Sequence, residues 1–139
     1  LGELTPAGQA QVVVDFGTAT TFDLVEAPNR YLGGAIAIGP QTAADALAQR
    51  TAKLPRIDLT PPKAAVGKNT LEALRSGLVL GYAALVEGMV RRFKEEAGEA
   101  LVIATGGFAE TLRPLCPCSD VVDEDLTLKG LLRIHLERG

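Results

Sequence analysis

The chain has 139 residues, of which 47% are hydrophobic and 22% charged, and its formal net charge is −3 at pH 7. That length corresponds to about one domain, and the apolar content is sufficient for a buried core, which excludes a disordered chain. A net charge this small, with lysines and arginines scattered along the sequence, argues against nucleic acid as the main partner.

Nothing in the sequence predicts a targeting segment or a membrane span. Residues 1–10 lack the basic start and apolar run of a signal peptide, and the longest apolar windows are broken by glycine or charge. Cys116 and Cys118 are separated by one residue, so we expect idle thiols rather than a structural disulfide. We therefore predict a cytoplasmic protein without membrane contact.

The first third of the chain predicts an antiparallel β-meander. Residues 11–14 form an apolar run typical of a buried strand, which ends in a turn at residues 15–18. Strand character resumes at residues 20–26 and again at residues 31–38. The third strand contains the pair Gly33–Gly34, which favours a bulge or the close approach of another backbone.

A first helix is predicted after this meander. Thr42 is a suitable N-cap, with Asp45 in the capping-box position, and the helix is expected to continue to residue 52. Residues 54–66 contain three prolines and predict a loop.

A second, longer helix follows. Asn69 is its expected N-cap, with Glu72 at the third helical position, and apolar residues continue at helical spacing to residue 97. Gly98 is expected to end this helix.

The last part of the chain alternates between strand and helix. Residues 100–104 predict a buried strand parallel to the first, followed by a turn into a short helix at residues 108–112. A brief strand at residues 121–122 and a final helix at residues 125–137 complete the order. Hairpins followed by helical crossovers predict an α/β domain with a mixed sheet, the layout of a ribonuclease-H-like lobe in actin-like ATPases.

Residues 15–21, Asp-Phe-Gly-Thr-Ala-Thr-Thr, are the most informative segment. Gly17 allows the backbone to approach a ligand closely, and the hydroxyls around Thr18 suit a phosphate. The Asp15 carboxylate would repel a phosphate directly. Its expected role is therefore to hold a cation that neutralises the charge of the phosphate. The alternative is an ordinary hairpin turn with threonines on exposed strand faces.

A second candidate is Thr105-Gly106-Gly107, after a strand and before a helix. Glycines at the carboxyl end of a strand leave room for a flat group such as adenosine, although a plain strand-to-helix turn would look the same. Residues 67–70, Gly-Lys-Asn-Thr, lack the spacing of a P-loop. His135 is the only histidine, and we assign it no chemistry.

Taken together, these segments resemble type III pantothenate kinases from residue 12 to residue 131. The resemblance is carried, in order, by VVVDFGTATTFDLV, YLGGAIAIG, RTAKLPRI, VGKNTLEALRSGLVLGY, VIATGG and DLTLKGL. It implies ATP-dependent phosphorylation of pantothenate, the first step of coenzyme A synthesis.

The resemblance also implies a role for individual residues. Asp15 would bind potassium or ammonium, and Gly17 and Thr18 would contact ATP, with Mg²⁺ as an optional companion of the nucleotide. Thr70 would contact pantothenate. Gly106 and Gly107 would lie near the adenosine.

Two motifs of the family are absent from these 139 residues: an Asp-x-Gly-Asn-Thr phosphate loop and a Gly-x-Asp-Arg segment that carries the catalytic base. Ile38 also stands where the family usually has proline. We therefore expect the C-terminal lobe of a longer enzyme at residues 11–139, preceded by a linker at residues 1–10, and no activity from this chain alone. A non-catalytic relative, or another actin-like small-molecule kinase, remains an alternative.

Small residues also recur along one face of the long helix, at Gly77, Gly81, Ala84 and Gly88. Glycine costs about 1 kcal/mol relative to alanine inside a helix, so a compensating close contact is expected. The contact could come from the same lobe. The resemblance instead implies a homodimer through helix 70–97.

Overall fold

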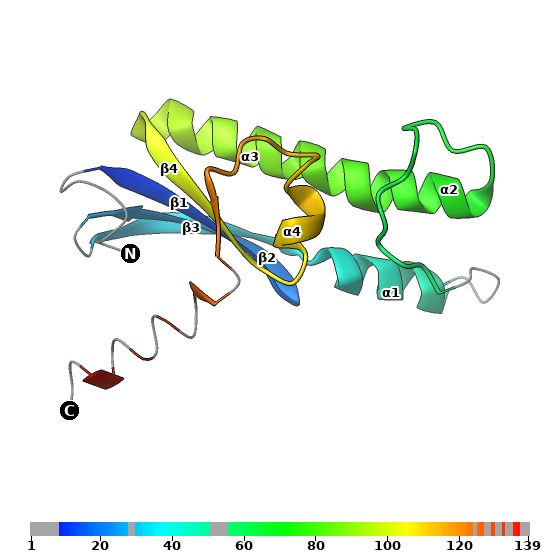
Figure 1. The fold of residues 1–139 in the computed structure, drawn as a ribbon, viewed down its shortest axis with the longest axis horizontal. Coiled ribbons are helices and arrows are strands. Elements are labelled where there is room, and N and C mark those ends of the chain that lie inside the picture. Colours follow the sequence, from blue (N-terminus) through cyan, green and yellow to red (C-terminus); the bar gives the residue numbers. More distant parts are fainter. Residues whose placement is uncertain are drawn as a thin grey trace.

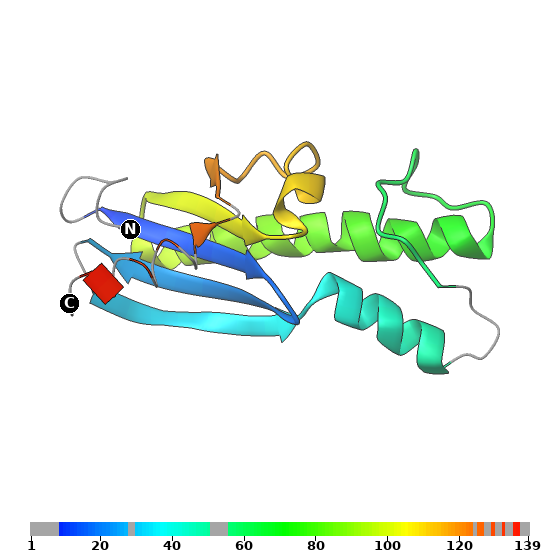
Figure 2. The same ribbon diagram turned by 60° about the horizontal axis from the view of Figure 1, so that its bottom comes forward.

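The structure is a computed structural model that describes residues 9–27, 30–50, 56–123, 125–126, 129, 132 and 135–136. Within this part of the chain, a five-stranded mixed sheet has the order β3-β2-β1-β4-β5. Its strands are β1 (Ala10–Phe16), β2 (Ala19–Glu26), β3 (Arg30–Ile38), β4 (Ala100–Gly106) and β5 (Val121–Val122). A long helix runs across one face of the sheet and continues beyond the ends of its strands, where it lies beside α1 (Pro40–Arg50; Figures 1 and 2).

The predicted meander and the predicted parallel strand are both confirmed. β1 pairs antiparallel with β2, β2 pairs antiparallel with β3, and β4 lies parallel to β1 on its other side. The predicted turn at residues 15–18 was too long, because Asp15 and Phe16 still belong to β1. Phe16 is 6% exposed and pairs with Thr20 on one side and Gly106 on the other, so burial of its ring keeps the strand extended to that point.

The glycine pair in β3 forms the expected irregularity. The register between β2 and β3 shifts between Leu24 and Val25, opposite the segment around Gly33, which has a φ of 131°. A side chain at Gly34 would collide with the backbone of Phe22. The bulge and the close approach that the sequence predicted therefore both occur here.

The long helix supplies most of the core that covers the sheet. It is continuous from Thr70 to Ala97 and consists of α2 (Thr70–Arg75), a π-helical segment η1 (Ser76–Leu80) and α3 (Gly81–Ala97). One side of the helix packs against the apolar face of β1, β2 and β4. The buried residues on that side of the helix are Val79, Tyr82, Ala83, Val86 and Val90.

Both ends of this helix are formed as the sequence predicts. The side-chain oxygen of Asn69 accepts a hydrogen bond of 2.9 Å from the backbone N–H of Glu72. The Glu72 carboxylate accepts in turn from the N–H of Lys68 at 2.7 Å, one residue before the position that a capping box predicts. Gly98 has a φ of 80° and donates to the carbonyl of Lys94.

The helix from Thr70 to Ala97 is long and apolar enough, by length and composition alone, to cross a bilayer. The sequence argument that no window could do so was therefore wrong. A core helix of a globular protein can meet the same criterion, and here 33% of the apolar window is buried, including Val79, Tyr82 and Val86 against the sheet. The glycines within this helix neither interrupt it nor lower its mean hydropathy enough to exclude a membrane span.

The first helix begins earlier than predicted. α1 (Pro40–Arg50) starts at Pro40, which suits the first helical position because its missing N–H would have no partner there. Thr42 is therefore not the N-cap, and its hydroxyl donates to the carbonyl of Thr18 instead. The predicted extension of this helix to residue 52 lies outside the described residues.

The region after β4 brings another correction. Cys116 and Cys118 are joined by a disulfide, where free thiols were expected. The chain turns sharply at Pro117 and places the two Cα atoms 5.3 Å apart, within the range that a disulfide spans. Cys116 is 1% exposed and belongs to the core.

The remaining elements agree with the sequence where they are described. The short helix α4 (Ala109–Leu112) starts one residue later than predicted, and β5 occupies residues 121–122 as expected. The predicted helix at residues 125–137 lies largely outside the described residues. β1 begins at Ala10, one residue inside the predicted linker, and residues 1–8 are outside the described part.

Candidate functional site

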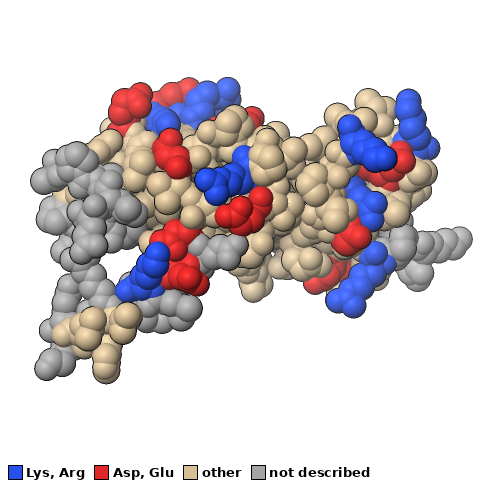
Figure 3. All heavy atoms as spheres, in the orientation of Figure 1, with Lys and Arg blue, Asp and Glu red and all other residues tan. Residues whose placement is uncertain are grey.

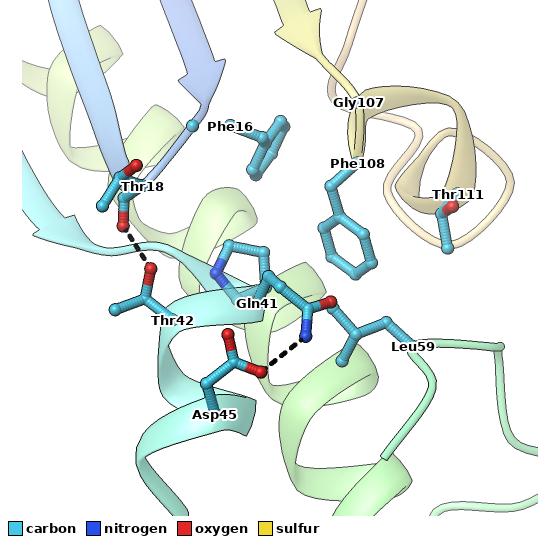
Figure 4. Close-up of a pocket in the computed structure, with 11 residues that line it drawn as sticks. Phe16, Thr18, Gln41, Thr42, Asp45, Leu59, Gly107, Phe108 and Thr111 are labelled. Carbon is cyan, nitrogen blue, oxygen red and sulfur yellow. Dashed lines mark hydrogen bonds between the residues drawn. The ribbon is translucent and has the colours of Figure 1, made fainter. Parts of the chain in front are cut away.

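A cavity of about 620 Å³ lies at the carboxyl ends of β1 and β4, where the first turn of α1 faces α4 (Figure 4). Its walls come from four separate segments of the chain. They are Phe16, Gly17, Thr18, Pro40, Gln41, Thr42, Asp45, Leu59, Gly107, Phe108 and Thr111. The crevice beyond the carboxyl ends of parallel strands is where ligands usually bind in α/β sheets.

The turn between β1 and β2 forms one wall of this cavity. The N–H of Gly17 donates to the carbonyl of Ala19 at 3.0 Å, which makes the turn tight. The carbonyl of Thr18 accepts from the N–H of Gly39 at 2.9 Å and from the hydroxyl of Thr42 at 2.8 Å. A side chain at Gly39 would collide with the backbone of Gly17 and Thr18, so a glycine is required for this approach.

The two glycines after β4 have different surroundings. Gly106 has a φ of 96°, and a Cβ atom there would meet the backbone of Phe16. Gly107 lines the cavity, and a Cβ atom there would meet no neighbour within 4 Å. Gly106 therefore allows β4 to turn closely past β1, whereas Gly107 leaves open space on the side of the cavity.

Two aromatic rings close the inner side of the cavity. The rings of Phe16 and Phe108 meet edge to face, with their centroids 5.9 Å apart. On the opposite wall, the side-chain amide of Gln41 donates to the Asp45 carboxylate at 3.0 Å. The cavity thus combines an apolar inner wall with a polar wall from the first turns of α1, as Figure 4 shows.

Asp15 lies beside this cavity without lining it. In the ladder it is paired with Thr21 on β2 and with Thr105 on β4. Burial raises the pKa of the Asp15 carboxyl above its ordinary value, and the charge of Asp23 raises it further. The hydroxyl of Tyr31 donates to Asp23 at 3.1 Å, and this hydrogen bond is the main cause of the raised pKa of Tyr31.

The oxygen donors around Asp15 suit a hard cation better than a transition metal. Paired residues of neighbouring strands project from the same side of a sheet, so the hydroxyls of Thr21 and Thr105 accompany the Asp15 carboxylate. Hard cations prefer such oxygen ligands. Among the described residues, no three histidine, cysteine, aspartate or glutamate side chains gather as a metal site would require.

Thr70 is separate from the residues named so far. It is the first residue of α2, is exposed, and does not line the cavity. In Figure 1, α1 leads away from the sheet, and α2 begins still further from the sheet than the far end of α1. Within one chain, the structure therefore brings Gly17, Thr18 and Gly107 together and leaves Thr70 apart.

The family model and the curated relatives agree with one another. The family model for type III pantothenate kinase matches residues 3–92. The chain belongs to this family. Type III pantothenate kinases from two strains of Thermus thermophilus are 95% and 94% identical to it over 97% of its length, and one from Deinococcus radiodurans is 54% identical over 92%. The chain spans about half the length of these relatives, 53%, 53% and 49% respectively.

A solved structure from Campylobacter jejuni, described as a Baf family transcriptional activator, also resembles the chain. The two share 24% identity with a TM-score of 0.64, over 94% of this chain and 59% of the other. This likeness shows a common fold and nothing about function.

Sequence reasoning missed the contribution of α1 to the site of this pantothenate kinase family member. Thr42 and Asp45 were interpreted as a helix cap, and Gln41 was given no role. Gly39 and Pro40 directly after a strand were the available signal, because glycine followed by proline at the first helical position indicates a tight strand-to-helix junction. The part played by Leu59, Phe108 and Thr111 had no recognisable sequence signal.

Proposed function

We propose that the full-length protein containing this chain transfers the γ-phosphoryl group of ATP to pantothenate, giving ADP and 4′-phosphopantothenate in the first step of coenzyme A synthesis. Membership of the type III pantothenate kinase family supports this activity. The observation that carries the site is that Gly17, Thr18 and Gly107 line one cavity at the carboxyl ends of β1 and β4. We place the protein in the cytoplasm, where ATP is available.

The proposed lobe is ribonuclease-H-like, one half of an actin-like ATPase. The strand order β3-β2-β1-β4-β5, with only β2 antiparallel to its neighbours, supports this proposal. In such an enzyme two lobes close over the nucleotide, and phosphoryl transfer depends mainly on positioning and neutralisation of charge. This chain would supply one wall of the site, and the catalytic base would come from the other half of the protein.

ATP would occupy the cavity with its phosphates at the turn and its adenosine towards β4. The hydroxyl of Thr18 would donate to a phosphate oxygen, and Gly17 would let the phosphate approach the backbone. The open side of Gly107 would accept the flat adenosine. Gly106 would act indirectly, by holding β4 close to Phe16.

A potassium or ammonium ion would be held by Asp15. The hydroxyls of Thr21 and Thr105, its partners on the neighbouring strands, would complete part of its oxygen shell. The cation would reduce the repulsion between the Asp15 carboxylate and the phosphates, and Mg²⁺ would accompany the nucleotide itself.

Pantothenate would contact Thr70, and two copies of the chain would associate through helix 70–97. The small-residue face supports this association: a Cβ atom added at Gly77, Gly81 or Gly88 would meet nothing within 4 Å. The face therefore has no described neighbour in its own lobe, although each glycine weakens the helix. A two-fold interface would place the same helix of both copies face to face. It would also allow Thr70 of one copy to serve a site near the other.

The test is release of ADP by the full-length protein with and without pantothenate, in potassium, ammonium and sodium buffers. We expect pantothenate-dependent ADP release in potassium or ammonium and little in sodium. Absence of any pantothenate-dependent ADP would refute the kinase proposal and favour a non-catalytic relative. Equal rates in all three buffers would remove the cation from the proposal, and the 139-residue chain alone is expected to be inactive.

A further inference from the structure

We infer that Thr42 is a positioning residue for the nucleotide, which fixes the turn at Gly17 and Thr18 before ATP binds. The inference rests on the proposed ATP site and adds a residue that lies in α1, away from the turn in sequence. It is carried by the hydrogen bond from the Thr42 hydroxyl to the Thr18 carbonyl, 2.8 Å long, across 24 residues of sequence. Figure 4 shows this bond at the edge of the cavity.

Both hydrogen-bond acceptor positions of the Thr18 carbonyl are filled by donors from the same segment of the chain, the junction between β3 and α1. A backbone carbonyl can accept two hydrogen bonds, and here the N–H of Gly39 and the hydroxyl of Thr42 provide them, at 2.9 and 2.8 Å. Rotation of the peptide between Thr18 and Ala19 would break both bonds. The orientation of this peptide is therefore set by the junction between β3 and α1.

This orientation matters because of the charge of the expected ligand. A carbonyl oxygen carries partial negative charge, and its exposure towards the cavity would repel a phosphate. With the oxygen held towards Gly39 and Thr42, the side chain of Thr18 remains for the ligand. Within the described part of the chain, the Thr18 hydroxyl has no hydrogen-bond partner of its own.

Thr42 can fix the turn because α1 is itself firmly held. Ala44, two residues further along, is 2% exposed and packs in a small core with Ile57 and Leu78, which are 3% and 6% exposed. The junction between β3 and α1 is also held at its first residue. The hydroxyl of Tyr82, in the long helix, donates to the carbonyl of Ile38 at the end of β3, at 2.6 Å. The donor therefore stands in place before the ligand arrives, which is the arrangement that preorganised sites require.

The test measures the affinity of the full-length protein for ATP directly, by equilibrium titration, alongside steady-state kinetics. Thr42→Val keeps the branched shape and removes the donor, Thr42→Ala removes the donor in a residue that favours helix, and Thr42→Ser keeps the hydroxyl. The control is Ala46→Val, at an exposed position of the same helix that does not line the cavity. Loss of one hydrogen bond predicts roughly three- to tenfold weaker ATP binding in the Val and Ala variants.

We expect KM for ATP to rise with the dissociation constant, while KM for pantothenate stays within about twofold, because only the nucleotide meets the turn. Thr42→Ser and Ala46→Val should resemble the unmodified protein. Unchanged ATP affinity in Thr42→Val and Thr42→Ala would overturn the inference. So would a Thr42→Ser variant as weak as Thr42→Val, since the hydroxyl would then be irrelevant.

The two proposals fail in different ways. If the unmodified protein binds ATP but forms no pantothenate-dependent ADP, the kinase proposal fails and the titrations still decide the role of Thr42. If the unmodified protein binds no ATP, the role of Thr42 in nucleotide binding is refuted with it.

Discussion

Asp15 and Asp23 project from the same face of the sheet on adjacent strands, with Asp15 opposite Thr21 and Asp23 opposite Val13. Burial is the main reason that the pKa of Asp15 is raised, and the carboxylate of Asp23 adds to the effect. A partly buried carboxylate in this position lowers the stability of the fold, and we have proposed that this one holds a cation. This relationship gives a prediction that separates a functional aspartate from a structural one.

Asp15→Asn is expected to lower activity and to stabilise the fold slightly at neutral pH. The folded pKa lies above the ordinary value of 3.8, so between these two values the folded protein binds more protons than the unfolded chain. The free energy of unfolding therefore falls as pH rises through this window, and the full cost is present above it. Asparagine removes that cost, so in buffer without potassium or ammonium, where no bound cation offsets it, Tm should rise at pH 7 and gain nothing at pH 3.

The same variant should lose on the order of a hundredfold in pantothenate-dependent ADP release, the scale for loss of one electrostatic group at a reacting centre. Thermal unfolding at the two pH values and the activity assay measure both effects on one sample. A fall in Tm at pH 7 would make Asp15 structural and contradict the prediction.

Asn69→Ala is expected to destabilise the long helix. The substitution removes the acceptor for the Glu72 N–H, and loss of an N-cap costs about 1 kcal/mol. Urea unfolding of the full-length protein should show a lower midpoint with an unchanged slope. Asn69→Asp keeps an acceptor and should match the unmodified protein. Equal midpoints for the Ala and Asp variants would show that the cap contributes nothing.

Gly81→Leu is expected to separate a dimer into folded monomers. Gly81 is exposed, and a Cβ atom there meets no neighbour, so a larger side chain fits the lobe itself but not a closely packed second helix. Analytical ultracentrifugation of the full-length protein measures the mass. Ala46→Leu, an exposed position on α1, should leave the dimer intact. A monomeric unmodified protein would contradict the proposed interface.

Gly81→Ala gives an independent check on the same helix face. If the face is free, alanine should stabilise the protein by about 1 kcal/mol because it favours helix over glycine. If another backbone packs there, the added methyl group should instead weaken association. Measuring Tm at low and high protein concentration distinguishes the two results, since only association makes Tm depend on concentration.

Cys116 and Cys118 should be unreactive towards a thiol reagent in the unreduced protein and should both react after reduction and unfolding. The closed loop is very short, so the chain-entropy estimate gives only about 1.5–2 kcal/mol of stabilisation. Cys118→Ser should therefore lower the free energy of unfolding by no more than that amount and leave the fold intact. Two reactive thiols in the unreduced, unfolded protein would contradict the disulfide.

Local patterns determined most of the secondary structure. The β-branched run in β1, the Asn69 cap and the Gly98 stop were all predicted because each depends on neighbours within a few residues. The parallel pairing of β4 with β1 also followed, since a buried strand after a long crossover helix has few other places to lie. The candidate phosphate turn at Gly17 and Thr18 was also predicted, because its glycine and hydroxyl residues are neighbours in the sequence.

Only the tertiary structure decided which of these residues act together. Thr42 was interpreted as a cap because the sequence shows its position in a helix but not the carbonyl of Thr18 that lies beside it. Gly106 and Gly107 look equivalent in sequence, yet one meets the backbone of Phe16 and the other opens into the cavity. The disulfide depended likewise on a turn at Pro117. Hydrogen bonds and close approaches between distant segments depend on how the sheet and helices pack, and local sequence carries no direct record of that packing.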